Sequence, residues 1–271
     1  MQSSVRANYT RIIIGMEFEL SPRQAGGASV VRIPDGWRLN MPSGPSHDYR
    51  LAQVDDYART PRRALKHAPP WTFSLCARLS QPDLPGTWGF GLWNDPFGLS
   101  LGFGGKPGRL PVLPQTAWFM HASPPNWLAL RAGSEPIPAN GFFAGSFKSA
   151  KIPSILFAPG LLVAPLLLVK PISRFLRRLA SRIIRQDQSK VSVDVTEWHA
   201  YSIHWLSESC SFYADGVEIL STPCSPRPPL GLVLWMDNQY AAWTPAGRLG
   251  YGTLENPAAW LEISDLILRH E

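Results

Sequence analysis

The feature that most constrains the fold is a series of short segments in which apolar and polar residues alternate. In the clearest one, residues 71–79, every second residue is apolar: Trp71, Phe73, Leu75, Ala77 and Leu79. Successive side chains of a β-strand point to opposite faces, so this pattern is typical of a strand with one buried face. The segment therefore predicts a strand that packs on a core.

Similar short segments recur along the chain. We expect further strands within residues 87–95, 115–123, 197–220, 229–240 and 259–271. Within 197–220, the pair Asp215-Gly216 predicts a tight turn between two strands. The 27 prolines and 22 glycines favour turns over long helices. The sequence thus predicts an all-β sandwich or jelly roll of two antiparallel sheets.

One segment departs from this pattern. Residues 152–169 are uncharged and almost wholly apolar, and residues 173–185 then place apolar residues at helical spacing opposite arginines. This predicts an inserted apolar segment and a basic amphipathic helix within residues 148–190. Prolines interrupt the apolar run, and strands of one sandwich are expected on both sides of it. We therefore do not expect it to cross a membrane.

Three roles are open for this insert. It could be a lid over a cleft, an anchor in the interface of an anionic bilayer, or a structural hairpin packed on the sandwich. For the first two roles the sequence indicates Phe175, Arg177, Arg178, Arg182 and Arg185.

The formal charge of +6 is concentrated in the insert. Residues 148–190 hold nine of the 26 Lys and Arg and one of the 20 acids, which leaves 17 bases and 19 acids elsewhere. A basic element without a recognised nucleic-acid motif argues against nucleic acid as the partner. An anionic membrane surface is one partner that this basic insert could take, beside a carbohydrate or amphiphilic small molecule in the cleft.

Three cysteines without metal-type spacing predict neither a disulfide framework nor a metal site, and we expect no cofactor. The apolar run near the first residue is too short for a signal peptide, so we expect a cytoplasmic protein, peripheral to a membrane if the insert anchors it. Whether the chain starts at Met1 or Met16 stays open.

Residues 197–219, EWHAYSIHWLSESCSFYADGVEI, resemble a paired-strand motif of glycoside hydrolase family 16, W/F-H-x-Y-x-I-x-W followed by I-x-F-Y-V-D-G. LPGTWGFGLWND is similar to the family's G-x-W-P-A-F-W-L strand, PLGLVLWMDNQY to its P-M-x-L-x-L-N strand, and AWLEISDLIL to its closing strand. The resemblance covers residues 68–268 with 148–190 as an insertion, and it implies a concanavalin A-like jelly roll. Residues 1–67 are expected to add strands and loops to the same domain.

The family's catalytic motif, Glu-x-Asp-x-x-Glu, is absent from this chain. Residues 115–123, where the resemblance would place it, carry Trp118, Met120 and His121 instead of carboxylates. The nearest partial match to this motif runs from Ser192 to Glu197 and has serine in place of the nucleophilic glutamate. Retaining hydrolysis needs two carboxyl groups roughly 5 Å apart, so the resemblance does not carry the family's activity to this chain.

Aromatic rings and amides suit ligands with apolar faces and polar edges, such as sugars. On strands that would line the family's concave face, the candidate ligand-binding residues are Trp88, Trp93, Asn94, Asp95, Trp118, Trp235, Asn238 and Tyr240. Asp237 and His121 are candidates for acid–base catalysis, because a titratable group within an apolar strand needs a partner or a task.

The leading hypothesis is a protein that binds a saccharide-bearing or amphiphilic ligand in an aromatic cleft near a membrane, without family-type hydrolysis. The alternative is a divergent glycosidase or another enzyme that acts on a glycan or lipophilic substrate through His121 and Asp237. A third hypothesis is a structural or protein-interaction sandwich.

Overall fold

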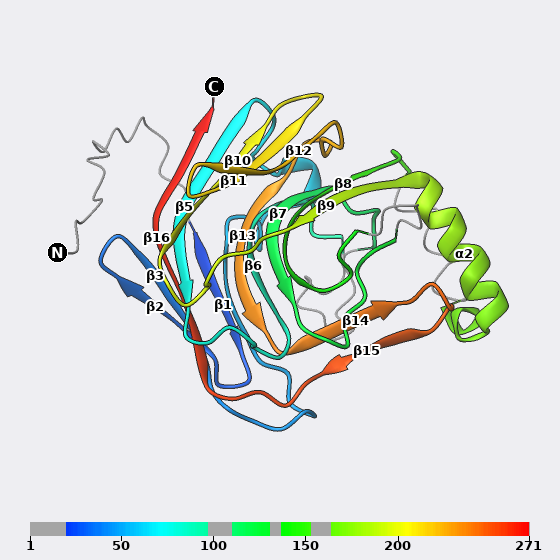
Figure 1. Ribbon diagram of the computed structural model, residues 1–271, viewed down its shortest axis with the longest axis horizontal. Helices are drawn as coiled ribbons and strands as arrows, with labels where there is room; N and C mark the ends of the chain where they lie inside the picture. Colours follow the sequence, from blue (N-terminus) through cyan, green and yellow to red (C-terminus); the bar gives the residue numbers. More distant parts are fainter. Residues whose placement is uncertain (1–19, 97–109, 131–136, 153–163, 271) are drawn as a thin grey trace.

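The computed structural model describes residues 20–96, 110–130, 137–152 and 164–270. They form two seven-stranded antiparallel sheets packed face to face, with a helix at one side (Figure 1). One sheet, called the front sheet here whatever the view, has the strand order β1 (Ser21–Ala25), β4 (Leu51–Asp55), β13 (Gly231–Asp237), β6 (Thr87–Trp93), β7 (Thr116–Ala122), β8 (Gly141–Ser149) and β9 (Ile184–Lys190). The back sheet has the order β12 (Val217–Thr222), β11 (Cys210–Ala214), β10 (His199–Trp205), β5 (Trp71–Leu79), β16 (Ala259–His270), β3 (Gly36–Met41) and β2 (Ser29–Ile33).

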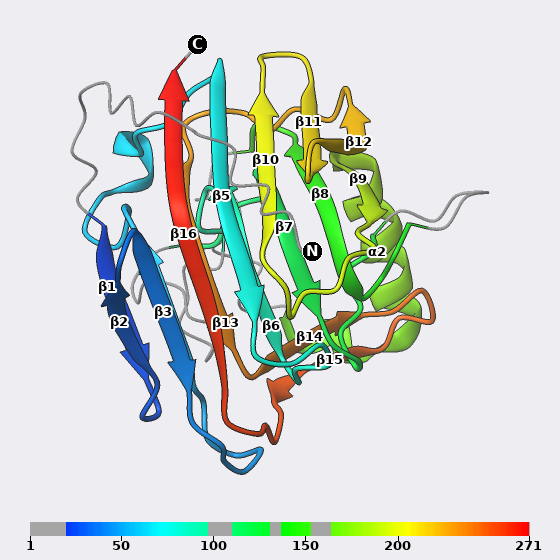
Figure 2. The same ribbon diagram turned by 60° about the vertical axis from the view of Figure 1, so that its left-hand side comes forward.

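The smaller elements lie at the rim of the sandwich. A separate hairpin follows β13 and consists of β14 (Gln239–Trp243) and β15 (Leu249–Thr253). Two 3-10 turns, η1 (Arg62–Ala64) and η3 (Ala164–Leu168), precede β5 and the helix α2 (Lys170–Ile183), respectively. Figure 2 shows α2 beside β9 and the β14–β15 hairpin, far from β2 and β3.

The main core lies between the two sheets. In β5 every second residue is buried, as the alternation in residues 71–79 predicts. Aromatic rings meet across the interface between the sheets. The ring centroids of Phe90 (front sheet) and Tyr201 (back sheet) are 5.0 Å apart, and those of Phe119 and Phe212 are 5.7 Å apart. Each fully buried side chain of this size stabilises the fold by roughly 1.5–3 kcal/mol.

Successive strands cross repeatedly between the sheets, for example from β3 to β4, from β5 to β6 and from β12 to β13. The prediction of an all-β jelly-roll sandwich of two antiparallel sheets with an inserted helical segment is confirmed. The turn Asp215-Gly216 is also confirmed, since both residues have positive φ and join β11 to β12.

The polarity of the inserted helix differs from the prediction. Residues 173–185 were expected to form one helix with all its arginines on the solvated face. Instead α2 ends at Ile183, Ile184 begins β9, and Arg177 is buried while Phe175 is exposed. The range 148–190 also includes the end of β8 and all of β9, so strands of the front sheet stand at both of its ends. The division of the chain into 1–67, 68–268 and 148–190 stays a prediction.

Candidate functional site

Three tryptophans from three neighbouring strands meet on the outer face of the front sheet, the face turned away from the back sheet. They are Trp93 at the end of β6, Trp118 in β7 and Trp235 in β13. The rings of Trp93 and Trp235 are stacked with centroids 6.4 Å apart and planes 4° apart. The ring centroid of Trp118 lies 6.1 Å from that of Trp93 and 5.5 Å from that of Trp235. The structure thus brings together three of the predicted ligand-binding residues, here called the tryptophan cluster.

Glycines in β6 make room for this cluster. Gly89 pairs with Trp235 in the ladder, and a Cβ atom on Gly89 would lie 2.8 Å from Cη2 of that indole. A Cβ on Gly91 would lie 2.7 Å from Cβ of Trp118. The sequence indicates that these glycines mark a close approach, and the groups that approach them belong to neighbouring strands of the same sheet.

The three indoles of the cluster have different surroundings. Nε1 of Trp235 donates to Oγ1 of Thr87 at 2.9 Å, and the Trp93 ring meets the Tyr57 ring edge-on. Nε1 of Trp118 is buried and finds no acceptor among the residues that the structure describes. A buried donor without an acceptor costs about 1–3 kcal/mol, so this N–H would gain from a ligand oxygen that reached it through a movement of the surrounding side chains.

Two carboxyl groups lie on the same outer face. Oδ1 of Asp237 accepts hydrogen bonds from Thr87 Oγ1 at 2.8 Å and from the Gln239 backbone N–H at 3.3 Å. Burial raises the pKa of Asp237 to about 7. Asp55 accepts from Nε2 of Gln53 at 2.7 Å, and burial raises its pKa as well.

These two carboxyl groups are too far apart for the family's chemistry. Asp55 pairs with Val233, and Asp237 lies four residues further along β13. At a rise of about 3.4 Å per residue, the separation along the strand is roughly 14 Å. Retaining hydrolysis needs roughly 5 Å, and inverting hydrolysis at most about 9.5 Å. Asp55 and Asp237 therefore cannot form such a pair.

Trp88 and His121, two further predicted site residues, lie away from the tryptophan cluster. Both side chains lie on the inner face of the front sheet, where their rings stack with centroids 5.5 Å apart and planes 14° apart. Burial lowers the pKa of His121 to about 4, so its imidazole is neutral at pH 7. Asp237 lies on the opposite face of the sheet, hence His121 and Asp237 cannot act together on one substrate.

Two of the predicted polar ligand residues, Asn94 and Asn238, form hydrogen bonds with backbone groups of neighbouring segments. Nδ2 of Asn94 donates to the Leu113 carbonyl at 2.9 Å, and its Oδ1 accepts from Gln115 N–H at 3.0 Å. Asn238 makes three hydrogen bonds to backbone groups and is fully buried. Asp95 is buried as well, at a backbone position with positive φ that directly follows Asn94.

Tyr240, the last predicted ligand-binding residue, lies in β14 and is partly exposed. Its ring packs over two glycines of β15, Gly250 and Gly252. Tyr240 is therefore part of the β14–β15 hairpin and not of the tryptophan cluster.

Sequence reasoning missed several residues that border the cluster. The ring of Tyr57 meets Trp93 edge-on at 5.9 Å, and Phe147 meets Trp118 edge-on at 6.1 Å. Gln53 donates a hydrogen bond to Asp55, and Thr87 is hydrogen-bonded to both Asp237 and Trp235. One signal could have found Gln53: it stands two residues before Asp55 in a short strand, so both side chains share a face.

A polar contact fixes α2 to the β14–β15 hairpin. Nε of Arg177 donates to the Trp243 carbonyl at 2.8 Å, and a second guanidinium nitrogen donates to the Ala129 carbonyl. Nε1 of Trp243 donates to Oγ of Ser173 at 2.9 Å. Arg177 is thus a packing residue of the helix, which corrects its predicted role as a lid or membrane residue.

The other predicted residues of the insert are exposed: Phe175, Arg178 and Arg182 on α2, and Arg185 on β9. Phe175 is 59% exposed, and Leu179, one helical turn further, is 44% exposed. In the part of the chain that the structure describes, no helix is both long and apolar enough to cross a bilayer.

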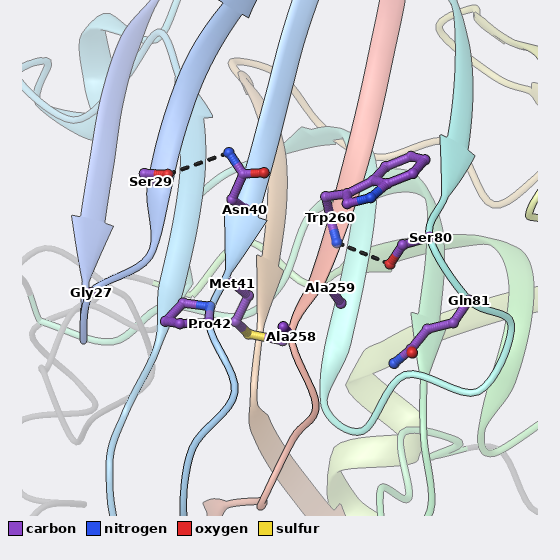
Figure 3. Close-up of a pocket in the computed structure, with 10 residues that line it drawn as sticks. All are labelled: Gly27, Ser29, Asn40, Met41, Pro42, Ser80, Gln81, Ala258, Ala259 and Trp260. Carbon is purple, nitrogen blue, oxygen red and sulfur yellow. Dashed lines mark hydrogen bonds between the residues drawn. The ribbon is translucent and has the colours of Figure 1, made fainter.

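A hollow of about 470 Å³ lies on the back sheet, where β3 ends and β16 begins. Figure 3 shows Asn40 and Ser29 on one side of it and Trp260, Ser80 and Gln81 on the other. None of the predicted site residues lines this hollow, and Trp260 serves below as a control.

No protein-family model matches the chain, and no curated protein matches it. Among solved structures, the chain is similar to the endo-β-1,4-glucuronan lyase from the fungus Trichoderma reesei, with 11% identity, coverage of 93% of this chain and 88% of that chain, and a TM-score of 0.46. It is similar to the legume lectin-like domain from Entamoeba histolytica, with 11% identity, coverage of 92% and 90%, and a TM-score of 0.46. It is also similar to LamAcat from Zobellia galactanivorans, with 11% identity, coverage of 88% of this chain and 81% of that chain, and a TM-score of 0.43. The likeness concerns the sandwich fold alone.

Proposed function

We propose that the protein binds a saccharide-bearing ligand at the tryptophan cluster on the outer face of the front sheet. The observation that carries this proposal is the meeting of three indoles, one of which has a buried N–H without an acceptor among the described residues. Aromatic faces stack on the apolar faces of sugar rings, and an indole N–H donates to a sugar hydroxyl. Trp93 is the most open of the three indoles and offers the stacking surface.

We propose further that this binding occurs without hydrolysis of the family 16 type. The strand at the motif position, β7, places Trp118 and Met120 on the outer face, where the family resemblance implies carboxylates. The carboxyl groups of Asp55 and Asp237 are too far apart to replace them. One observation favours the alternative of an enzyme: the pKa of Asp237 is raised to about 7, which suits a general acid.

Titration with β-glucan oligosaccharides, followed by tryptophan fluorescence and calorimetry, tests the binding proposal. Trp118→Phe keeps an aromatic ring and removes the N–H donor, so we expect a loss of about fivefold to tenfold in affinity. Trp93→Ala removes the stacking surface and should cost at least about tenfold. Trp260→Phe, on the back sheet, is the matched control and should leave affinity unchanged. Equal affinity of all three variants and the wild type would contradict the proposal.

A reducing-sugar assay separates binding from catalysis. We expect no release of sugar from β-glucans by the wild type. If sugar is released and Asp237→Asn abolishes the release while the protein stays folded, the enzyme hypothesis replaces the binding-only proposal.

A second proposed function is peripheral association with a membrane through η3 and α2. The specific observation is the exposure of several apolar side chains on this unit, among them Leu168, Phe175 and Leu179, next to exposed basic residues. We place the protein in the cytoplasm, since Cys76, Cys210 and Cys224 are all free thiols, as a reducing compartment favours. Flotation of the purified protein with lipid vesicles is the test, and failure to float with any vesicle would refute this association.

A further inference from the structure

The exposed surface of η3 and α2 carries two stripes of opposite chemistry. An apolar stripe consists of Leu168, Phe175 and Leu179, which are 75%, 59% and 44% exposed. Phe175 and Leu179 stand four residues apart on α2 and therefore lie on one side of the helix, and Leu168 ends η3 just before the helix begins. A basic stripe consists of Arg174, Arg178 and Arg182, four residues apart and all exposed. Ser173 and Arg177 are buried on the opposite side of α2, so both stripes face away from the sandwich.

The polar contacts of α2 keep the apolar stripe exposed. Ser173 and Arg177 bind the Trp243 indole, the Trp243 carbonyl and the Ala129 carbonyl. A roll of the helix that buried Phe175 and Leu179 would break these bonds and leave buried carbonyl groups without donors. Exposure of the apolar stripe is therefore a consequence of how the helix is fixed.

The charge of this surface is uniformly positive. No acidic residue occurs between positions 164 and 186, and none of Lys170, Arg174, Arg178 and Arg182 forms an ion pair with an acid in the described part of the chain. An isolated apolar stripe would suit another protein equally well. Apolar side chains beside unpaired arginines match a bilayer interface whose headgroups are anionic.

We infer that the two stripes bind the headgroup region of an anionic bilayer, with Phe175, Leu179 and Leu168 entering the interface and the arginines contacting lipid phosphate and carboxylate groups. This inference rests on the proposed membrane association and names its partner. Arg177 has no part in lipid contact and positions the helix. The cytoplasmic leaflet is the anionic one, which agrees with the proposed compartment.

Flotation with two vesicle preparations tests the lipid class: phosphatidylcholine alone, and equal parts of phosphatidylcholine and phosphatidylserine. We expect binding to the mixed vesicles and little to the neutral ones. Each arginine near an anionic surface contributes about fivefold in affinity, so the triple variant Arg174→Gln, Arg178→Gln, Arg182→Gln should lose about a hundredfold. A matched control removes three exposed charges elsewhere, Arg59→Gln, Arg63→Gln and Lys66→Gln, and should bind within about threefold of the wild type, since distant charges are screened.

A second pair of variants tests the apolar stripe. Phe175→Ser with Leu179→Ser should abolish flotation, whereas Val31→Ser with Val217→Ser, which changes two exposed apolar residues of the back sheet, should not. All these positions are exposed, so thermal unfolding should be nearly unchanged and report that each variant is folded.

The outcomes distinguish the two proposals. Equal binding to neutral and mixed vesicles would overturn the inference of anionic lipid and leave membrane association standing. Binding to neither would overturn both. A wild-type dimer in light scattering that Phe175→Ser with Leu179→Ser converts to a monomer, without vesicle binding, would show that a second copy of the chain covers this surface and would also overturn the inference.

Discussion

Thr87 donates a hydrogen bond from Oγ1 to Oδ1 of Asp237 at 2.8 Å, and the same Oγ1 accepts the indole N–H of Trp235 at 2.9 Å. A hydroxyl group has one proton, so acceptance from Trp235 leaves that proton for the carboxyl group. These two hydrogen bonds, called the Thr87 relay, link the tryptophan cluster to Asp237, the carboxyl group of the outer face whose pKa is raised most.

This relay predicts how stability depends on pH. Burial raises the pKa of Asp237 to about 7, whereas an unfolded aspartate titrates near 4. Between about pH 4 and 7 the folded protein keeps a proton that the unfolded chain has lost, so the contribution of Asp237 to stability falls as pH rises and is constant above about pH 7. The total fall is on the order of 4 kcal/mol.

Urea unfolding of the wild type and Asp237→Asn at a series of pH values measures this effect. The asparagine still accepts from Thr87 but does not titrate, so the variant should gain stability relative to the wild type as pH rises through this range. Parallel stability curves would show that Asp237 ionises normally.

His121 should act in the opposite direction. Its pKa is lowered to about 4 because burial against Trp88 disfavours the imidazolium ion. The stability that it contributes is complete above about pH 6.5 and is lost as pH falls toward 4. His121→Phe keeps the ring stack and should remove this loss, which unfolding measurements at about pH 4.5 and pH 7 would detect. An imidazole that titrates near pH 6.5 in NMR spectra would contradict the buried placement.

Arg177 and Arg178 are neighbours on α2 with different expected effects on stability. Arg177→Met removes the donors to two backbone carbonyls and should cost about 2–4 kcal/mol. Arg178→Met changes an exposed side chain and should cost at most about 0.5 kcal/mol. Hydrogen exchange of the α2 amides, together with urea unfolding, measures both. Equal protection of α2 in the two variants would show that the Arg177 contacts do not fix the helix.

The packing of Trp235 over Gly89 makes that glycine sensitive to substitution. A Cβ atom there would lie 2.3 Å from the Phe119 carbonyl oxygen, so Gly89→Ala should destabilise the fold by about 1–3 kcal/mol and change the near-ultraviolet circular dichroism of the cluster. Gly250→Ala, where the nearest atom is 3.4 Å away, is the control and should change neither. An unaltered near-ultraviolet spectrum of Gly89→Ala would mean that Trp235 does not rest on this glycine.

Where alternation or turn chemistry was strong, the sequence predicted the fold correctly. The strand at 71–79 and the turn Asp215-Gly216 depend on local preferences of the backbone. The strands β8 and β9 were missed for opposite reasons. β8 is buried on both faces and shows no alternation, and β9 is largely polar because its buried glutamines, Gln186 and Gln188, face the outer side of the sheet.

The candidate site was predicted in part. Trp88 and Trp93 stand five residues apart in β6, so a strand must direct them to opposite faces. The sequence could show that only one of them lines the cleft. It could not show which one, because both faces of this strand are apolar.

The sequence by itself determined that this chain forms β-strands with short turns, since these follow from local alternation and backbone preferences. The tertiary structure decided which face of the front sheet holds the tryptophan cluster and which side of α2 is buried. Both depend on what packs against them: Trp88 belongs to the core between the sheets and stacks on His121, and the carbonyls of Trp243 and Ala129 hold Arg177 inward and leave Phe175 outside. Burial is a property of a residue and its neighbours in space, and those neighbours come from distant parts of the chain.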